Sequence, residues 1–357
     1  MGVRDLNFRE KVPVGILGAT GAVGQRFVSL LSSHPWFQIE FLGASENSVG
    51  KAYGKAVHWT LSTPIPEEVA QIPIQKCVPE AAKCTLFFSA LDSSVAYDTE
   101  LSFAKRGFVV VSNTKAHRMD PDVPLLIPEV NAKHLALIEA QKKKNKGFIV
   151  TNPNCSVIAL SLALKPLYDR FGLEAVEVVT LQAISGSGHP GIPSLDIMDN
   201  VIPFISDEEE KIETEPLKIL GSFDSGKIDY ASFKISAQAN RVPVTDGHMA
   251  CLSVKFKEKP SEKSIIDAWT GFTGEAQVLE LPFAPAHPLQ YFEEENYPQP
   301  KLHRDLNRGM TVSIGRLRKC PILDNKFVIL SHNTLRGAAG GAILNAELLV
   351  KQGLIFW

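Results

Sequence analysis

Short apolar runs alternate with helical patterns through the first 150 residues of the chain. The runs have the length of buried strands and lie at 12–18, 39–44, 85–90, 108–112 and 147–151. Apolar residues with helical spacing follow the first run, and residues 95–106 also have helical character. Strands that are apolar on both faces and alternate with helices predict a parallel sheet with helices on both sides.

The pattern changes after residue 173. Segments 174–184, 249–256 and 310–318 alternate apolar and polar residues. In the second of these segments every other residue from Ala250 onward is apolar, so the apolar residues share one face. This alternation predicts half-buried, antiparallel strands with one face of their sheet packed on helices.

Two further segments complete the outline of the second half. The Pro-rich stretch 282–300 is expected to form a surface loop or arm. Residues 336–351 are expected to form the last helix. The glycines and alanines at its start predict close packing against another element.

Length and composition limit the classes of protein to which the chain can belong. At 357 residues it is long for a single core, so two domains are expected. A hydrophobic content of 45% with a net charge of −2 argues against disorder, nucleic-acid binding and attachment to an anionic membrane. Five cysteines without a CxxC pair favour a reduced, cytoplasmic compartment, and no metal site is expected.

No segment has the pattern of a membrane or export signal. No apolar run approaches the roughly 20 residues that span a bilayer. The first twelve residues, MGVRDLNFREKV, are charged and contain no apolar signal-peptide core.

A glycine-rich turn follows the first predicted strand. Gly18, Gly21 and Gly24 are spaced as GxxGxxG between that strand and a helix. The first glycine allows a tight turn, the second lets the backbone approach a pyrophosphate, and the third lets the helix pack on the strand. The helix N-terminus offers free N–H groups and a positive dipole to the phosphates. This context predicts a dinucleotide site, and a plain strand-to-helix turn is the alternative.

The end of the second strand distinguishes NAD from NADP. NAD sites usually place Asp or Glu there, because the carboxylate accepts a hydrogen bond from the ribose 2′-OH. Here small residues occupy the strand end, and Ser45, Ser48 and Lys51 suit a 2′-phosphate. Glu46 argues in the other direction. We predict NADP.

Cys155 has the setting of a nucleophile. It lies in Thr-Asn-Pro-Asn-Cys-Ser, residues 151–156, between a predicted strand and a helix near 156–169. A helix N-terminus lowers the pKa of a thiol and so favours the attacking thiolate. A lone cysteine is more often a small buried hydrophobic residue, but Asn154 and Ser156 flank this one. The pattern predicts a nucleophilic cysteine.

Acyl transfer needs acid–base help, and two of the nine histidines are the main candidates. His248 follows a glycine at the mouth of a predicted strand, and His189 lies in the glycine-rich loop SGSGHPG. Their spacing favours His248 without excluding His189.

Seven motifs, in order along nearly the whole chain, give it a family resemblance. They are GATGAVGQ at 18–25, SNTKAHRM at 112–119, PLLIPEVN at 124–131, NPNCS at 152–156, QAISGSGHPG at 182–191, EEEKIETE at 208–215 and RVPVTDGH at 241–248. With these motifs the chain resembles the aspartate-β-semialdehyde dehydrogenase family, in the branch found in archaea and fungi.

The resemblance implies a reductive dephosphorylation. The family reduces β-aspartyl phosphate with NADPH to aspartate semialdehyde and phosphate, a step towards lysine, threonine and methionine. By resemblance Cys155 matches the nucleophile, His248 the acid–base residue and Gln182 the residue that orients the reacting group.

The resemblance also implies the binding residues. Arg241 matches the group that grips the α-carboxylate, a planar bidentate task suited to Arg. The other substrate and phosphate ligands it implies are Arg118 and Lys211 for phosphate, Glu208 for the amine, and Asn154. Because Glu209 and Glu210 directly follow Glu208, the sequence leaves open which of the three contacts the amine. The cofactor contacts it implies are Gly18, Thr20, Gly21, Ala22, Val23, Gly24, Ser45, Ser48, Lys51, Gly188 and, at the nicotinamide end, Asn333.

The implied fold is α/β and similar to that of glyceraldehyde-phosphate dehydrogenase. A Rossmann-type NADP-binding domain is expected from 1–154 and 332–357, so that the C-terminal helix returns to it. An α+β catalytic and dimerisation domain is expected from 155–331. The resemblance also implies self-association as a homodimer or homotetramer, with a small-molecule substrate and phosphate as the other partners.

Three alternatives to this function remain. Malonyl-CoA reductase uses the same thioester chemistry with NADPH, but it needs neither an ammonium contact nor the pair of phosphate ligands. The presence of Glu208, Arg118 and Lys211 therefore favours the acyl phosphate. N-acetyl-glutamyl-phosphate reductase is a further enzyme alternative. A catalytically inactive NADP-binding or redox-sensing protein is the alternative of another class, and the pairing of Cys155 with His248 argues against it.

Overall fold

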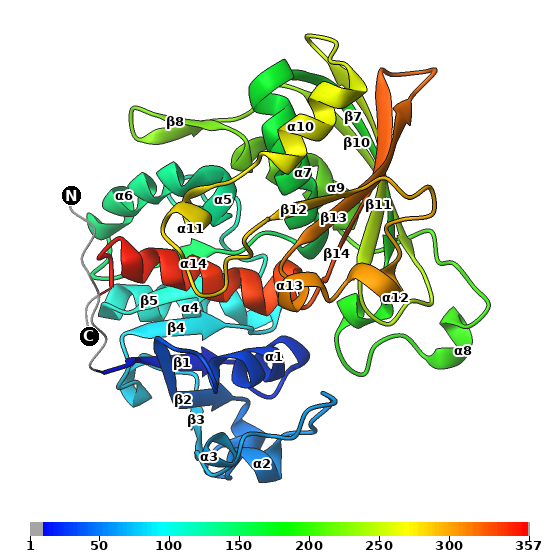
Figure 1. Cartoon of the computed structure of the whole chain (residues 1–357). Coiled ribbons are helices and arrows are strands. Elements are labelled where there is room, and N and C mark those ends of the chain that lie inside the picture. The colour runs from blue at the N-terminus through cyan, green and yellow to red at the C-terminus, as the bar shows by residue number, and fades with distance from the viewer. Residues whose placement is uncertain (1–9, 356–357) are drawn as a thin grey trace.

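The structure contains two six-stranded sheets that lie next to each other, and helices pack on each of them (Figure 1). The computed structural model describes residues 10–355. Most of the N-terminal segment for which no signal peptide was predicted therefore lies outside the described residues. Within them, no helix is long and apolar enough to cross a membrane.

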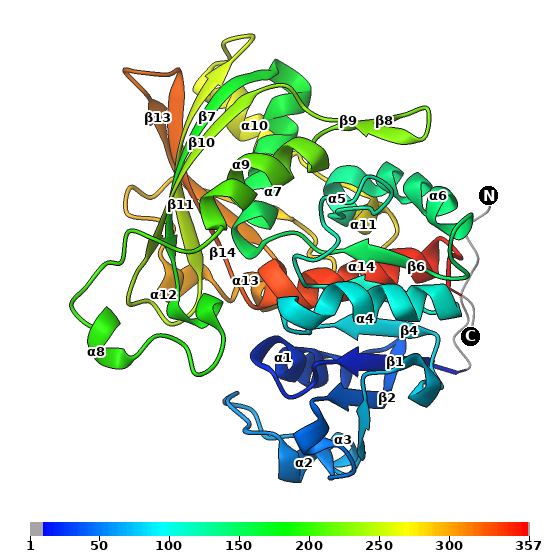
Figure 2. The ribbon, with the colours of Figure 1, turned by 180° about the vertical axis from the view of Figure 1, so that it is seen from behind.

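The first sheet is entirely parallel, as the apolar runs predicted. Its strands, in the order β3-β2-β1-β4-β5-β6, are Ile74–Lys76, Phe37–Ala44, Val12–Leu17, Leu86–Ser89, Val109–Ser112 and Phe148–Thr151. Every residue of β4, β5 and β6 is buried. Helix α14 (Gly340–Lys351) covers the face seen in Figure 1, and α4 (Ser93–Arg106) covers the face seen in Figure 2.

The second sheet is mixed, so the prediction of antiparallel strands is right only for its centre. Its order is β10-β7-β11-β14-β13-β12, with strands Lys234–Arg241, Leu173–Gln182, His248–Phe256, Asn325–Ser331, Val312–Lys319 and Leu289–Phe292. The central pairs are antiparallel, but β10 runs parallel to β7 and β12 parallel to β13. Long connections allow this, because a crossover can bring the chain back in the same direction.

The segment 282–300 was expected to be a loop, and this is wrong for β12. Leu289, in β12, is buried in the second core. Prolines on both sides restrict β12 to four residues at the edge of the sheet, where a missing N–H is tolerated.

Three helices pack on one face of the second sheet. They are α7 (Cys155–Phe171), α9 (Glu208–Ile219) and α10 (Glu262–Thr270). In Figure 2, α9 lies beside α7, and α9 also contacts β10. The apolar residues of these helices and of the alternating strands form the second core.

The last helix begins later than predicted. Residues Leu335–Ala339 form a π-helical turn that packs on α7 and α1 (Ala22–Leu31) before α14 starts. A Cβ on Gly337 would lie 2.9 Å from the Cβ of Cys155. The absence of a side chain at Gly337 therefore lets this turn lie directly against the predicted nucleophile.

Candidate active site

Three predicted site residues meet at one edge of the second sheet. Gln182 ends β7, Arg241 ends β10, and His248 begins β11. Arg241 is in register with Gln182 because β10 and β7 are parallel. His248 joins them because β11 runs antiparallel to β7. The mixed topology thus gathers residues from three strands.

Asn154 caps the helix that Cys155 begins. Its side-chain oxygen accepts hydrogen bonds from the N–H groups of Ser156 at 2.9 Å and Val157 at 3.3 Å. Its side-chain nitrogen donates to both carboxylate oxygens of Glu208, at 3.0 Å each. The cap therefore fixes the position of a carboxylate close to the nucleophile.

Glu208 is the carboxylate that the structure brings into the site. Gln182 donates to it at 2.9 Å, and the Lys211 ammonium lies 3.6 Å from its other oxygen. Glu209 instead accepts from the Ala239 N–H, and Glu210 is exposed. Of the three neighbouring glutamates, Glu208 is therefore the one that contacts Asn154, Gln182 and Lys211.

His248 is held as a buried, neutral imidazole. Its Nδ1 accepts a hydrogen bond from the Ala183 N–H at 3.0 Å, so Nε2 carries the proton. Burial, with the positive charges of Arg241 and His332, lowers the pKa of His248 to about 3. Nε2 is buried and has no hydrogen-bond partner among residues 10–355. A buried N–H without a partner is suited to a ligand.

His189 has a different environment. It is exposed, and its ring lies against that of His58, with centroids 5.1 Å apart. His58 in turn accepts a hydrogen bond from Gln25 of α1 through its carbonyl. The loop that carries Gly188 and His189 therefore reaches the nucleotide side of the molecule.

The thiol of Cys155 does not have the lowered pKa that its helix position predicts. Burial, followed by the negative charge of Glu208, raises the pKa of this thiol to about 12. Arg118 and Arg241 act in the opposite direction, as does the Ser156 N–H, but more weakly. The prediction is wrong for the ligand-free protein, because burial of the thiol and, second, the charge of a carboxylate distant in sequence both raise its pKa.

The two arginines are buried and anchored to the protein. Arg118 donates from Nε to the Asn152 carbonyl at 3.0 Å and from Nη1 to Glu215 at 2.9 Å. Arg241 donates to the carbonyl of Ala183 at 2.8 Å. Because Ala183 also donates its N–H to His248, one peptide segment orients both the arginine and the histidine.

The glycine-rich turn has the form that a dinucleotide needs. Gly18 has a φ of +80°, and a Cβ there would lie 2.4 Å from the Ala90 carbonyl oxygen. A Cβ on Gly24 would lie 2.2 Å from the Gly18 carbonyl oxygen. Gly21, the N-cap of α1, leaves the first N–H groups without a side-chain cap. Thr20, Ala22 and Val23 complete this turn and helix start.

Ser45, Ser48 and Lys51 follow β2 at the same edge of the first sheet. Lys51 donates to the Asn47 carbonyl at 2.8 Å. Glu46, which argued for NAD, lies 3.3 Å from the Lys76 ammonium, and both side chains are exposed. Its charge is therefore partly offset by a neighbouring lysine.

Asn333 connects two segments of the site. Its side chain donates to the Ser185 hydroxyl at 2.8 Å and accepts from the Gly247 N–H at 2.8 Å. It therefore ties the loop that precedes Gly188 to the turn that precedes His248.

Comparisons with known proteins find relatives over nearly the whole chain. A family model described as "Semialdehyde dehydrogenase, NAD binding domain" matches residues 13–138, and one described as "Semialdehyde dehydrogenase, dimerisation domain" matches residues 164–336. An aspartate-semialdehyde dehydrogenase from Archaeoglobus fulgidus is 50% identical over 344 residues, which cover 96% of this chain and 99% of that protein. The chain belongs to the aspartate-semialdehyde dehydrogenase family.

Other members of the family agree. The Schizosaccharomyces pombe aspartate-semialdehyde dehydrogenase is 48% identical, with 96% of this chain and 99% of that protein covered. The crystal structure of aspartate-semialdehyde dehydrogenase with NADP from Candida albicans has a TM-score of 0.90 and 42% identity, covering 97% of this chain and 100% of that chain. The resemblance seen in the motifs, to the archaeal and fungal branch, is confirmed.

One buried residue of this site, Glu215, was not predicted from the sequence. Glu215 accepts from Arg118 through one oxygen and from the Asn154 N–H through the other. It lies seven residues after Glu208 on α9, so helical spacing places the two carboxylates on the same side of the helix. That spacing was a usable signal in the motif EEEKIETE.

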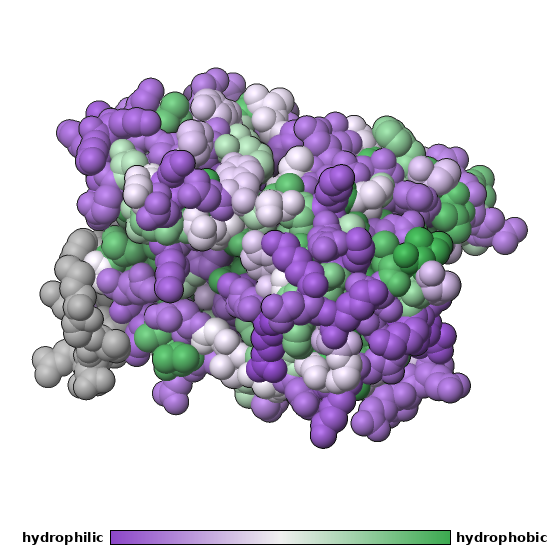
Figure 3. Space-filling view, turned by 90° about the horizontal axis from the view of Figure 1, so that it is seen from above, coloured by the Kyte–Doolittle hydropathy of each residue, from purple (hydrophilic) through white to green (hydrophobic). Residues whose placement is uncertain are grey.

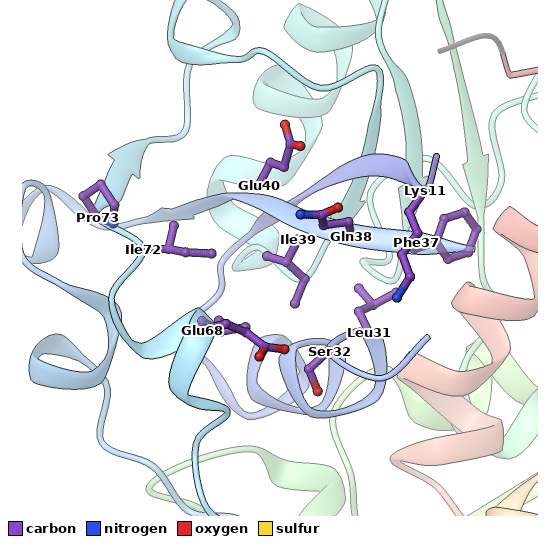
Figure 4. A pocket seen from close by; sticks show the side chains of 11 residues that line it. Lys11, Leu31, Ser32, Phe37, Gln38, Ile39, Glu40, Glu68, Ile72 and Pro73 are labelled. Carbon is purple, nitrogen blue, oxygen red and sulfur yellow. The ribbon is translucent and has the colours of Figure 1, made fainter. Parts of the chain in front are cut away.

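A separate cavity of about 750 Å³ lies away from this site (Figure 4). It is bounded by α1, β2 and the segment 68–73, and its lining includes Lys11, Glu40 and Glu68. None of the predicted site residues lines it. The proposed chemistry makes no use of this cavity.

Proposed function

We propose that this protein reduces β-aspartyl phosphate with NADPH to aspartate semialdehyde and phosphate, through a thioester on Cys155. The reaction is the aspartate-semialdehyde dehydrogenase step towards lysine, threonine and methionine. The observation that carries the proposal is the charge around Cys155: the carboxylate of Glu208 and the guanidinium groups of Arg118 and Arg241 all act on its thiol. Arg241 shares its contact with Ala183 with His248, whose Nε2–H has no partner among the described residues.

The charged groups suit an acyl phosphate that also carries an amino acid head. The guanidinium of Arg241 would bind the α-carboxylate, and Glu208 would bind the ammonium group. Arg118 and Lys211 would bind the phosphate. A malonyl-CoA substrate has no ammonium group for the buried Glu208 carboxylate to bind. This argument favours the amino acid substrate.

The chain's own residues perform most of the steps. Binding of the substrate ammonium to Glu208 would offset the second cause, after burial, of the raised thiol pKa, and would so favour the Cys155 thiolate. The thiolate attacks the carbonyl carbon, and the C–O bond to phosphate breaks. The Cys155 backbone N–H, at the start of α7, can stabilise the oxyanion. Gln182 would orient the reacting group.

His248 would act on the acyl oxygen in the second half-reaction. Bound NADPH would supply the hydride that reduces the thioester. The Nε2–H of the neutral His248 donates a hydrogen bond to the carbonyl oxygen as negative charge forms on it. The resulting oxyanion forms the C=O bond again as the C–S bond breaks, which releases the aldehyde and restores the thiolate.

We assign the cofactor to the glycine-rich turn. Gly18, Gly21 and Gly24 leave space for the pyrophosphate, and the uncapped start of α1 offers it N–H groups. Ser45, Ser48 and Lys51 would hold the 2′-phosphate, and Gly188 and Asn333 would lie towards the nicotinamide. We divide the chain into an NADP-binding domain of 1–154 with 332–357 and a catalytic and dimerisation domain of 155–331.

We also propose self-association through the open face of the second sheet, as a homodimer or homotetramer in the cytoplasm. Cys251 is in register with Val179 and Val328, and none of the three is buried, so they share this face. An adjoining arm exposes four apolar side chains: Leu195, Met198, Val201 and Phe204. The top view in Figure 3 is mostly hydrophilic, with hydrophobic patches towards the side of the second sheet. Large exposed apolar surface favours a protein partner.

The experiment runs the reaction in reverse, with aspartate semialdehyde, phosphate and NADP. Sustained NADPH production, beyond one per active site, should require all three, and Cys155→Ala should abolish it while NADP binding remains. A wild-type protein that is inactive with these substrates but consumes NADPH with malonyl-CoA would refute the proposal.

A further inference from the structure

Helix α9 places two further charged side chains beyond Glu208 and Lys211. Glu215 and Lys218 follow at helical spacing, and only 2% of Glu215 and 1% of Lys218 is exposed. Charged residues are rarely buried to this extent unless they are paired. Their partners therefore indicate what they do.

The Glu215 carboxylate bridges two parts of the site. One oxygen accepts from Nη1 of Arg118 at 2.9 Å, and the other accepts from the backbone N–H of Asn154 at 2.8 Å. Arg118 is the proposed phosphate ligand, and Asn154 directly precedes the nucleophile. A single buried carboxylate thus fixes the guanidinium relative to the start of α7.

Lys218 holds the backbone of the loop that carries this arginine. Its ammonium donates to the carbonyl oxygens of Arg118 at 2.7 Å, Asp120 at 2.7 Å and Val123 at 2.9 Å. The guanidinium and the backbone of Arg118 are therefore both attached to α9, the helix that also presents Glu208 and Lys211.

The guanidinium retains donors for a ligand. Of its five N–H groups, one bonds to Asn152, one to Glu215 and one, at 3.3 Å, to the Asn113 carbonyl. The remaining N–H groups have no protein acceptor among the side-chain bonds of the described residues and keep an orientation that Glu215 sets.

We infer that Glu215 is a positioning residue for phosphate transfer, acting through Arg118. The inference rests on the proposed function, because it concerns the phosphate that leaves or attacks the Cys155 thioester. Glu215 orients the guanidinium so that phosphate lies in line with the thioester carbonyl. It makes a smaller contribution to hydride transfer, which does not involve phosphate.

The test compares Glu215→Gln with Glu210→Gln, which removes an exposed carboxylate from the same helix. A glutamine amide cannot accept from both Arg118 and Asn154, since its nitrogen only donates. In the reverse reaction Glu215→Gln should raise the KM for phosphate roughly tenfold or more. The KM values for aspartate semialdehyde and NADP should change less than about twofold. Glu210→Gln should match the wild type.

A second readout separates positioning from general damage. Without phosphate, the wild-type protein should release NADPH in a burst limited to its active sites, as the thioester forms. Glu215→Gln should keep the rate of this burst, whereas a merely structural role would slow it together with the phosphate step. Combining Glu215→Gln with Arg118→Gln should raise the KM for phosphate no further than Arg118→Gln alone.

Several results would overturn the inference. An unchanged KM for phosphate would do so, and so would a lower one, which would mean that Glu215 only competes with phosphate for Arg118. If Glu215→Gln does not fold, Glu215→Asp can be tested in the same way. It keeps the carboxylate charge, but its shorter side chain moves the carboxylate away from Arg118 and Asn154. A wild-type protein without NADPH production refutes the proposed function instead, so the two failures are distinguishable.

Discussion

The backbone N–H of Ala183 donates to Nδ1 of His248 at 3.0 Å. This bond fixes the tautomer and leaves Nε2–H as the buried donor without a protein partner among the described residues. Replacing His248 with Ala should lower kcat about 10²- to 10³-fold, because the oxyanion formed by hydride addition loses a hydrogen-bond donor. Steady-state kinetics in the reverse direction would measure this loss, and NADP binding should be unchanged.

His189→Ala is the matched control for His248. His189 was the other candidate of the sequence, but it is exposed and contacts His58. Its replacement should keep kcat within about threefold of the wild type, since surface substitutions usually have small effects. A kcat loss as large as that of His248→Ala would show that His189, and not His248, has this role.

Glu208→Gln should make the ligand-free thiol more reactive. The Glu208 carboxylate is the second cause, after burial, of the raised Cys155 pKa, so its removal should lower that pKa. Alkylation by iodoacetamide at pH 8 should become faster by about threefold to tenfold, by the size of a close charge interaction. The KM for aspartate semialdehyde should rise, because the ammonium group loses its carboxylate.

The wild-type pH dependence tests the same point. Because the pKa of Cys155 is raised to about 12, the alkylation rate should increase steadily with pH from 7 to 10 without a plateau. Glu210→Gln should behave like the wild type. A plateau reached near neutral pH would contradict the raised pKa of the ligand-free protein.

Gly337→Ala should displace the nucleophile. The new Cβ would lie 2.9 Å from the Cβ of Cys155 and 3.0 Å from its Cα, so either the π-helical turn or the start of α7 must shift. A shift of this kind should lower kcat by about 10²-fold, because catalysis depends on near-ångström placement of the reacting atoms. Thermal unfolding measured in parallel should show a smaller effect than activity. Equal kcat values in Gly337→Ala and the wild type would show that the contact between residue 337 and Cys155 tolerates a methyl group.

Two buried histidines should make the fold sensitive to acid. Burial lowers the pKa of His248 to about 3 and that of His134 to about 4, whereas both are near 6.5 when unfolded. Between about pH 6.5 and 4 the unfolded chain binds protons that the folded chain does not. The free energy of unfolding should therefore decrease as the pH is lowered from 6.5 to 4, by up to ~1.4 kcal/mol per pH unit for each histidine.

Urea unfolding at a series of pH values would measure this slope. His134→Asn removes one of the two groups, so its slope between pH 6.5 and 4 should be shallower. Identical slopes in the variant and the wild type would show that His134 is not neutral in the folded state. Above pH 6.5 the two proteins should have parallel stabilities.

Features that depend on neighbouring residues were predictable from the sequence. The parallel sheet follows from apolar runs, and the dinucleotide turn from glycines whose required contacts, such as Gly24 with Gly18, are local. The position of Cys155 at a helix start also follows from adjacent residues. The assignment of His248 over His189 needed the family resemblance, since spacing alone left both open.

Features that depend on distant residues were not predictable from local pattern. The thiol pKa is raised rather than lowered, because the fold buries Cys155 and, second, brings the Glu208 carboxylate close to it from another helix. Glu215 meets Arg118 across 97 residues of sequence. The parallel pairing of β10 with β7 depends on a long connection, which the alternation of apolar and polar residues does not describe.

The most direct test of the central claim is to trap the acyl group on Cys155. Wild-type protein is incubated with aspartate semialdehyde and NADP without phosphate, then digested and examined by mass spectrometry. The predicted result is an aspartyl adduct on the Cys155 peptide, formed together with one NADPH per active site and removed when phosphate is added. NADPH formation and turnover without any adduct on Cys155 would contradict the thioester mechanism.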